Sequence, residues 1–158
     1  GGKRAVARAL ARLETGAEDP ATAALLDAAA AAPRGHVVGL TGPPGVGKSS
    51  LANRLIALWR AEGLSVAVLA VDPSSRRTRG ALLGDRTRIV TDPEDQGVFV
   101  RSMAARDRLG GLAEVTWPAA VLMRALFDRV LIETVGVGQS ETEIADLADT
   151  VEIGRAHV

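Results

Sequence analysis

The stretch that decides the fold of this chain is Gly42-Pro43-Pro44-Gly45-Val46-Gly47-Lys48-Ser49. It fits the phosphate-binding P-loop pattern, G-x-x-x-x-G-K-[ST], at every fixed position. The glycines permit a tight turn that aims backbone N–H groups at phosphate oxygens, the lysine reaches the β and γ phosphates, and the serine hydroxyl ligates Mg²⁺. The loop, together with the following Ser50, therefore predicts a binding site for a nucleoside triphosphate.

The sequence on either side of the loop supports this interpretation. His36–Thr41 has the pattern of a short buried strand, and residues 50–62 have the pattern of a helix, so the order is strand, loop, helix, as the motif requires. Only Lys3 and Lys48 are lysines among the 19 basic residues. Because arginine is the usual cation of this chain, the lysine at position 48 indicates that this position requires a lysine side chain.

The rest of the chain alternates between strand and helix patterns. Apolar runs predict strands at 65–72, 97–101 and 129–134, with a further strand starting near Asp149, and helices are expected at 3–14, from Pro20 to about Ala31, and at 112–127. This alternation predicts an α/β fold, a three-layer P-loop NTPase with a mainly parallel sheet, preceded by two N-terminal helices. Trp59 and Trp117 are both expected in the core.

Composition narrows the functional classes. The chain has 158 residues, of which 47% are hydrophobic, no cysteine and a formal net charge of zero. Zero net charge gives no electrostatic reason to expect nucleic acid or an anionic membrane as a partner. The absence of cysteine excludes disulfides and thiol chemistry within these residues, and no apolar run reaches the roughly 18 residues of a membrane span. We expect a globular, cytoplasmic protein.

Two predicted strands end in an acid, Asp72 and Glu133. A P-loop needs a carboxylate that orders Mg²⁺, and the carboxyl ends of parallel strands meet at one edge of a sheet. The predicted metal ligands are therefore Ser49, Asp72 and Glu133. Taken alone, each acid has an alternative interpretation, in which it is a surface or helix-capping carboxylate and not a metal ligand.

Two further positions are candidates for catalysis. Gly136 lies in a glycine-punctuated segment, 135–139, whose backbone could turn its N–H onto a γ-phosphate and release it after hydrolysis. Asp85 either orients water or supports the metal, or it is a helix N-cap. The basic segment 73–80 either closes over phosphates or is solvated.

Four stretches together resemble the MeaB/ArgK family of P-loop GTPases: 38–49, 67–75, 83–88 and 132–141. The resemblance runs from about residue 3 to residue 151. It implies a Mg²⁺-dependent, homodimeric switch protein that binds GTP, hydrolyses it to GDP and acts as a chaperone for an adenosylcobalamin-dependent acyl-CoA mutase, usually methylmalonyl-CoA mutase. By resemblance, Lys48 binds phosphates, Glu133 is the acid of the Walker-B type, and Asp85 is a catalytic candidate.

The resemblance also sets the expected domain organisation. Residues 1–33 form a helical segment, 34–151 an incomplete P-loop GTPase domain, and 152–158 a non-native tail, because this heptapeptide resembles a translated sequencing adapter. With no initial Met, the chain is expected to be a fragment whose C-terminal part is missing. The family's guanine-reading N-K-x-D motif is absent from residues 1–158, so specificity for guanine rests on the resemblance.

Other functions use the same loop. The family has also been described as an ATPase or kinase of lysine/arginine/ornithine transport. A nickel-delivery GTPase shares the P-loop and the strand-end glutamate, but it carries metal through Cys and His clusters, whereas this sequence has no Cys and 2 His. A small-molecule kinase and a protein that binds nucleotide without turnover are the remaining alternatives.

Overall fold

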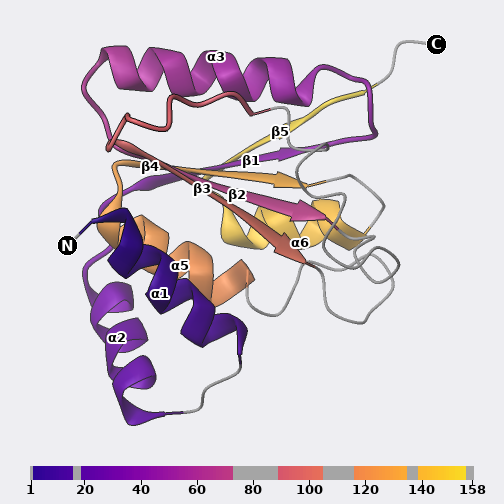
Figure 1. Ribbon diagram of the computed structural model, residues 1–158. Coiled ribbons are helices and arrows are strands. Elements are labelled where there is room, and N and C mark those ends of the chain that lie inside the picture. Colours follow the sequence, from indigo (N-terminus) through magenta and orange to yellow (C-terminus); the bar gives the residue numbers. More distant parts are fainter. Residues whose placement is uncertain (1, 16–18, 73–88, 105–115, 135–138, 156–158) are drawn as a thin grey trace.

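The computed structural model describes residues 2–15, 19–72, 89–104, 116–134 and 139–155. These residues form a five-stranded sheet with helices on both faces (Figure 1). The strands are β1 (His36–Thr41), β2 (Val66–Asp72), β3 (Val98–Ala104), β4 (Arg129–Thr134) and β5 (Thr150–Ile153). They lie in the order β3-β2-β4-β1-β5, and neighbouring strands are parallel.

The helices complete three layers. One face of the sheet is covered by α3 (Lys48–Ala61), and the other by α1 (Lys3–Glu14), α2 (Pro20–Ala31), α5 (Thr116–Leu126) and α6 (Gln139–Leu147) (Figure 1). The predicted α/β fold and its two N-terminal helices are therefore confirmed. None of the helices in the described ranges is long and apolar enough to cross a bilayer. The expected tail, 152–158, overlaps β5 at its first two residues, and its origin stays a prediction.

The sheet separates two apolar clusters, because the inner strands are buried on both faces and their side chains alternate between them. On β4, Val130 and Ile132 belong to the cluster beneath α5 and α6, whereas Leu131 belongs to the cluster beneath α3. Trp59 is buried as expected, with 9% of its surface exposed. The prediction for Trp117 was wrong.

Trp117 is 55% exposed because it lies on the outer face of α5. The buried face of that helix is formed at helical spacing by small and apolar residues: Thr116, Ala119, Ala120, Leu122 and Met123. A tryptophan one position after Thr116 is turned about 100° away from that face. Its apolar sequence neighbours gave no indication of this rotation.

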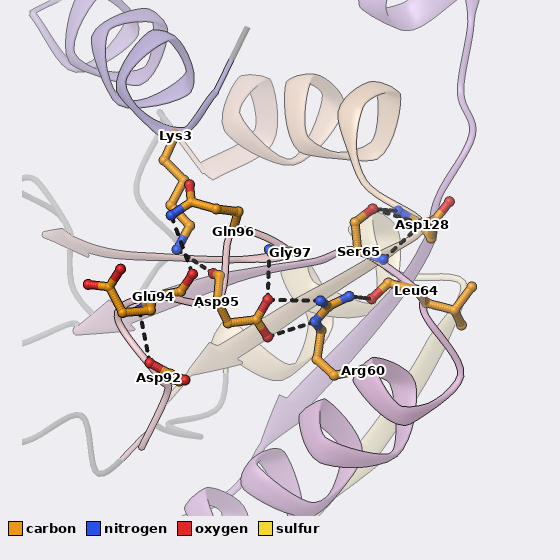
Figure 2. A network of polar contacts seen from close by, with 10 residues as sticks. All are labelled: Lys3, Arg60, Leu64, Ser65, Asp92, Glu94, Asp95, Gln96, Gly97 and Asp128. Carbon is orange, nitrogen blue, oxygen red and sulfur yellow. Dashed lines mark hydrogen bonds and ion pairs between the residues drawn. The ribbon is translucent and has the colours of Figure 1, made fainter.

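Polar contacts gather at the amino ends of the strands (Figure 2). The guanidinium of Arg60, at the end of α3, donates to both carboxylate oxygens of Asp95 at 2.8 Å, and Gly97 N–H, just before β3, donates to the same carboxylate at 2.9 Å. Lys3 of α1 donates to the Asp95 carbonyl oxygen. One aspartate thus connects α1, α3 and the start of β3.

Asp128 makes a second connection at this edge. Its Oδ2 accepts hydrogen bonds from the N–H and hydroxyl of Ser65 at 2.8 and 2.7 Å, and Arg34 donates to its Oδ1. These bonds, led by the one from the Ser65 backbone, lower the pKa of Asp128 from 3.8 to about 2. The carboxylate therefore holds the start of β2 against the start of β4.

Asp128→Ala is expected to reduce the free energy of unfolding at neutral pH by about 1–3 kcal/mol, because two half-buried donors of Ser65 lose their acceptor. Since the folded pKa is depressed, this stabilisation is present above pH 3.8 and is lost as pH falls toward about 2. Urea unfolding at several pH values measures it, with the exposed Asp146→Ala as control. A variant as stable as the wild type at neutral pH would contradict the assigned role.

Candidate nucleotide site

The P-loop leaves the carboxyl end of β1 and ends at the first turn of α3. Gly45 and Gly47 adopt φ values of 82° and 93°, a left-handed conformation that favours glycine. The helix carries neither a capping side chain at Gly47 nor an acidic residue in its first turn. Its N-terminal N–H groups and the positive end of its dipole therefore suit an anion, which is the property that a phosphate site requires.

Lys48 folds back across the loop. Its ammonium donates to the carbonyl oxygens of Gly42 and Pro43 at 2.7 and 2.8 Å. Burial lowers the pKa of Lys48, and the negative charge of Glu133 opposes this shift. The loop's own carbonyl oxygens thus hold the cation against the P-loop, and its contact with phosphates stays a prediction.

Glu133 reaches the site from β4. In register it pairs with Leu40 of β1 on one side and with Ala70 of β2 on the other, so the central position of β4 brings this acid to the P-loop. Ser49 Oγ lies 3.4 Å from Glu133 Oε1, a long hydrogen bond in which the hydroxyl donates. Burial raises the pKa of Glu133, while Lys48 and Ser49 act in the opposite direction.

Ser49 and Glu133 present the hard oxygen donors that Mg²⁺ prefers. No cluster of three or more His, Cys, Asp or Glu side chains is found in the described ranges. Phosphate oxygens of a bound nucleotide would add further ligands of the same kind. When bound, Mg²⁺ would neutralise charge on the β and γ phosphates. The hydroxyl and the carboxylate already lie close enough together to share one ion.

The other predicted site residues are described in part or not at all. Asp72 is the last residue of β2, opposite Ala104 of β3, which puts its backbone at the same edge of the sheet as Glu133. Its side chain lies outside the described residues, as do Asp85 and Gly136. Their roles stay predictions.

The structure adds two residues that the sequence had not singled out. Thr41 and Thr134 are the last residues of β1 and β4, and both are buried at the edge that carries the P-loop. Threonine is common in strands, so its type gave no signal. The observable signal was that each follows an apolar run and directly precedes a glycine-containing loop.

A parallel α/β sheet, a P-loop at the end of β1 and an acid at the end of β4 define a P-loop protein that binds nucleoside triphosphates. Residues 6–154 match the family described as methylmalonyl-CoA mutase-associated GTPase MeaB. The chain belongs to this family of GTPases.

The chain is similar to part of a protein named as a GTPase and to a smaller part of a fused mutase. A protein named as a GTPase in Pyrococcus horikoshii is 55% identical over 117 residues, which are 73% of this chain and 37% of that protein. The fused isobutyryl-CoA mutase of Cupriavidus metallidurans is 39% identical over 155 residues, 94% of this chain and 14% of that protein.

A solved structure has the same fold. The crystal structure of an LAO/AO transport system kinase is similar with a TM-score of 0.66 and 31% identity, over 96% of this chain and 45% of the other. The chain thus spans 37% of the archaeal relative and 45% of the solved one.

Proposed function

We propose that the protein is a Mg²⁺-dependent switch that binds GTP and hydrolyses it. The observation that carries the proposal is the convergence of Lys48, Ser49 and Glu133 at one edge of the sheet, with Ser49 Oγ 3.4 Å from Glu133. A cation for the phosphates, a hydroxyl for the metal and an acid for the metal are the parts that phosphoryl transfer needs. Membership of a GTPase family supports guanine as the base.

We further propose that the switch serves an adenosylcobalamin-dependent acyl-CoA mutase, acting as its chaperone in the cytoplasm and as a homodimer. The name of the family refers to a mutase, and a relative is named a fused isobutyryl-CoA mutase. A polypeptide that joins two activities keeps them at a high effective concentration, which benefits partners that work together. This supports a mutase as the partner of the present chain.

Nucleotide turnover tests the proposal directly. The purified protein is expected to hydrolyse GTP in preference to ATP, only with Mg²⁺, and slowly, on the order of 10⁻³ per second, because a regulatory GTPase depends on its partner for rapid turnover. Phosphate release with GTP or ATP, with and without EDTA, measures each part. Fast turnover without a partner, or a preference for ATP, would contradict the switch.

The similarity to the LAO/AO transport system kinase favours a second candidate, an ATP-dependent kinase. It requires an acceptor that gains the phosphoryl group, whereas a GTPase releases the group to water. Radiolabelled γ-phosphate separates the two, because a kinase leaves label on the acceptor and a GTPase leaves it as free phosphate. A nickel-delivery role gains no support from the described part of the chain, which has no metal-binding cluster of three such side chains.

A further inference from the structure

Two buried hydroxyls meet just beyond the point where β1 and β4 stop pairing. Within the described strands, the last registered pair of β1 with β4 is Leu40 with Glu133. At the next position along each strand, Thr134 Oγ1 donates a hydrogen bond of 3.1 Å to Thr41 Oγ1. The two side chains thus extend the connection between the strands by one residue.

The threonine pair lies on the face of the sheet opposite Glu133. Thr41 is 0% exposed and Thr134 is 2% exposed, so both hydroxyls are removed from water. Side chains alternate along a strand, and Thr134 therefore shares the face of Ile132, in the cluster beneath α5 and α6. Glu133 faces Ser49 on the α3 side. The threonines thus do not compete with these two residues for a metal, and they support the site from behind.

Packing alone does not require hydroxyls here. Val71 of β2 is the registered neighbour of Thr134 and is buried, so this level of the sheet accepts the apolar residue of the same shape. Replacing both partners of a buried hydrogen bond with apolar groups of equal shape is often nearly neutral for stability. What a pair of valines would not supply is a directional bond between the two strand ends.

Each threonine is joined directly to a part of the candidate site. Thr134 follows Glu133, the acid proposed to hold the metal. Thr41 precedes Gly42, whose carbonyl oxygen accepts a hydrogen bond from Lys48. Because the ends of structural elements open more readily than their middles, a bond at this position limits the movement of Glu133 relative to the P-loop.

We propose that Thr41 and Thr134 are positioning residues, which hold Glu133 at the distance from Ser49 at which both can share one divalent cation. This inference rests on the proposed function, since Mg²⁺ is the cation of that function. Ser49 Oγ and Glu133 Oε1 lie 3.4 Å apart, and Mg²⁺ demands oxygen ligands in near-ideal geometry at about 2.0–2.1 Å. A small displacement at the end of β4 would therefore weaken the coordination, while the backbone N–H groups of the P-loop would still bind phosphates.

The double variant Thr41→Val/Thr134→Val tests this role, with Mn²⁺ as a spectroscopic substitute for Mg²⁺. It keeps the shape and removes both hydroxyls, so it is expected to unfold near the wild-type temperature and, in EDTA, to bind GDP within about twofold of wild type. Its affinity for Mn²⁺ in the complex with GDP should fall about fivefold, the equivalent of one hydrogen bond. Calorimetry measures GDP binding, and electron paramagnetic resonance of free Mn²⁺ measures the metal affinity.

Two comparisons distinguish positioning from a general loss of packing. Thr41→Val and Thr134→Val each break the same bond, so each folded single variant should weaken Mn²⁺ binding as much as the double variant does. In a Glu133→Gln background, the double valine variant should cause no further loss, because the ligand that the pair positions has lost its charge.

Two control variants separate the hydroxyls from the rest of the side chain and from stability. Thr41→Ser/Thr134→Ser retains both hydroxyls and should keep the wild-type affinity for Mn²⁺, which tests the inference even if the valine variants do not fold. Thr22→Val removes another buried hydroxyl, one that donates to Asp19 at the start of α2, and should change stability without changing the affinity for GDP or Mn²⁺.

The outcomes separate the inference from the proposed function. If the wild type binds Mn²⁺ with GDP and the folded double valine variant binds it equally well, the positioning role is overturned and the switch stands. A folded serine variant that loses Mn²⁺ affinity, or an undiminished loss in the Glu133→Gln background, would also overturn it. If the wild type binds GDP no better with Mn²⁺ than in EDTA and does not hydrolyse GTP, both proposals fail together.

Discussion

Lys48→Ala is expected to weaken GTP binding at least about a hundredfold. The ammonium lies over the loop, held by two carbonyl oxygens at 2.7 and 2.8 Å, and its charge-assisted bonds would pass to the phosphates of the nucleotide. Hydrogen bonds that involve a charge contribute about 1.5–3 kcal/mol each, and two of them correspond to a factor of a hundred or more. No other lysine is available, because the only other one is Lys3.

Calorimetry with GTP and Mg²⁺ measures this loss, and Lys3→Ala is the matched control. Lys3 donates to the Asp95 carbonyl oxygen at the amino ends of the strands, so its removal should leave nucleotide affinity unchanged (Figure 2). Lys48→Arg should not restore binding, because the planar guanidinium is larger and differently shaped from the ammonium. Unchanged affinity in Lys48→Ala would show that the loop is not the nucleotide site.

Glu133→Gln is expected to have opposite effects on activity and on stability. Removing the charge takes away a ligand expected to hold Mg²⁺, so kcat for GTP should fall about a hundredfold or more. Burial, however, raises the pKa of Glu133, which means that ionising this acid costs more free energy in the folded protein than in the unfolded chain. The stability from this group is present at low pH and is lost as pH rises through the raised pKa, so the neutral glutamine should stabilise the nucleotide-free protein at pH 7.

Thermal unfolding without nucleotide tests the expected gain in stability, and single-turnover hydrolysis tests the expected loss of activity. The difference in melting temperature between the variant and the wild type should shrink as pH falls, because the wild-type carboxyl then takes up a proton. Glu62→Gln, at the exposed end of α3, should change neither property. An active Glu133→Gln protein would remove this acid from the metal site, and a destabilised one would indicate that its ionised form is well compensated.

The elements of the fold were predictable, while their spatial order required the structure. Apolar runs and helical periodicity predicted β1, β2, β4 and the two N-terminal helices close to their observed bounds. Nothing local to Arg129–Thr134 indicates that this strand lies between β1 and β2, since strand order depends on how the helices pack between them. Trp117 illustrates the same limit, because a single step around a helix decides between core and surface.

Some residues of the candidate site could likewise be predicted from the sequence, and others could not. Lys48 and Ser49 were predictable from spacing alone, because the P-loop fixes which side chain meets which phosphate. Glu133 followed from its place at the end of an apolar run. Thr41 and Thr134 could not be paired from the sequence, since only the registered contact of Leu40 with Glu133 brings these strand ends together.

The polar contacts in Figure 2 lie at the amino ends of the strands, at the opposite end of the sheet from the candidate nucleotide site. Arg60, Asp95 and Asp128 connect helices and strands at the amino ends, while Lys48 and Glu133 stand at the carboxyl ends. Among the described residues, no hydrogen bond or ion pair joins the two groups, so one end of the sheet can accept substitutions while the other stays the same. A protein built this way can alter its nucleotide chemistry or its partner over evolutionary time without losing the framework that keeps it folded.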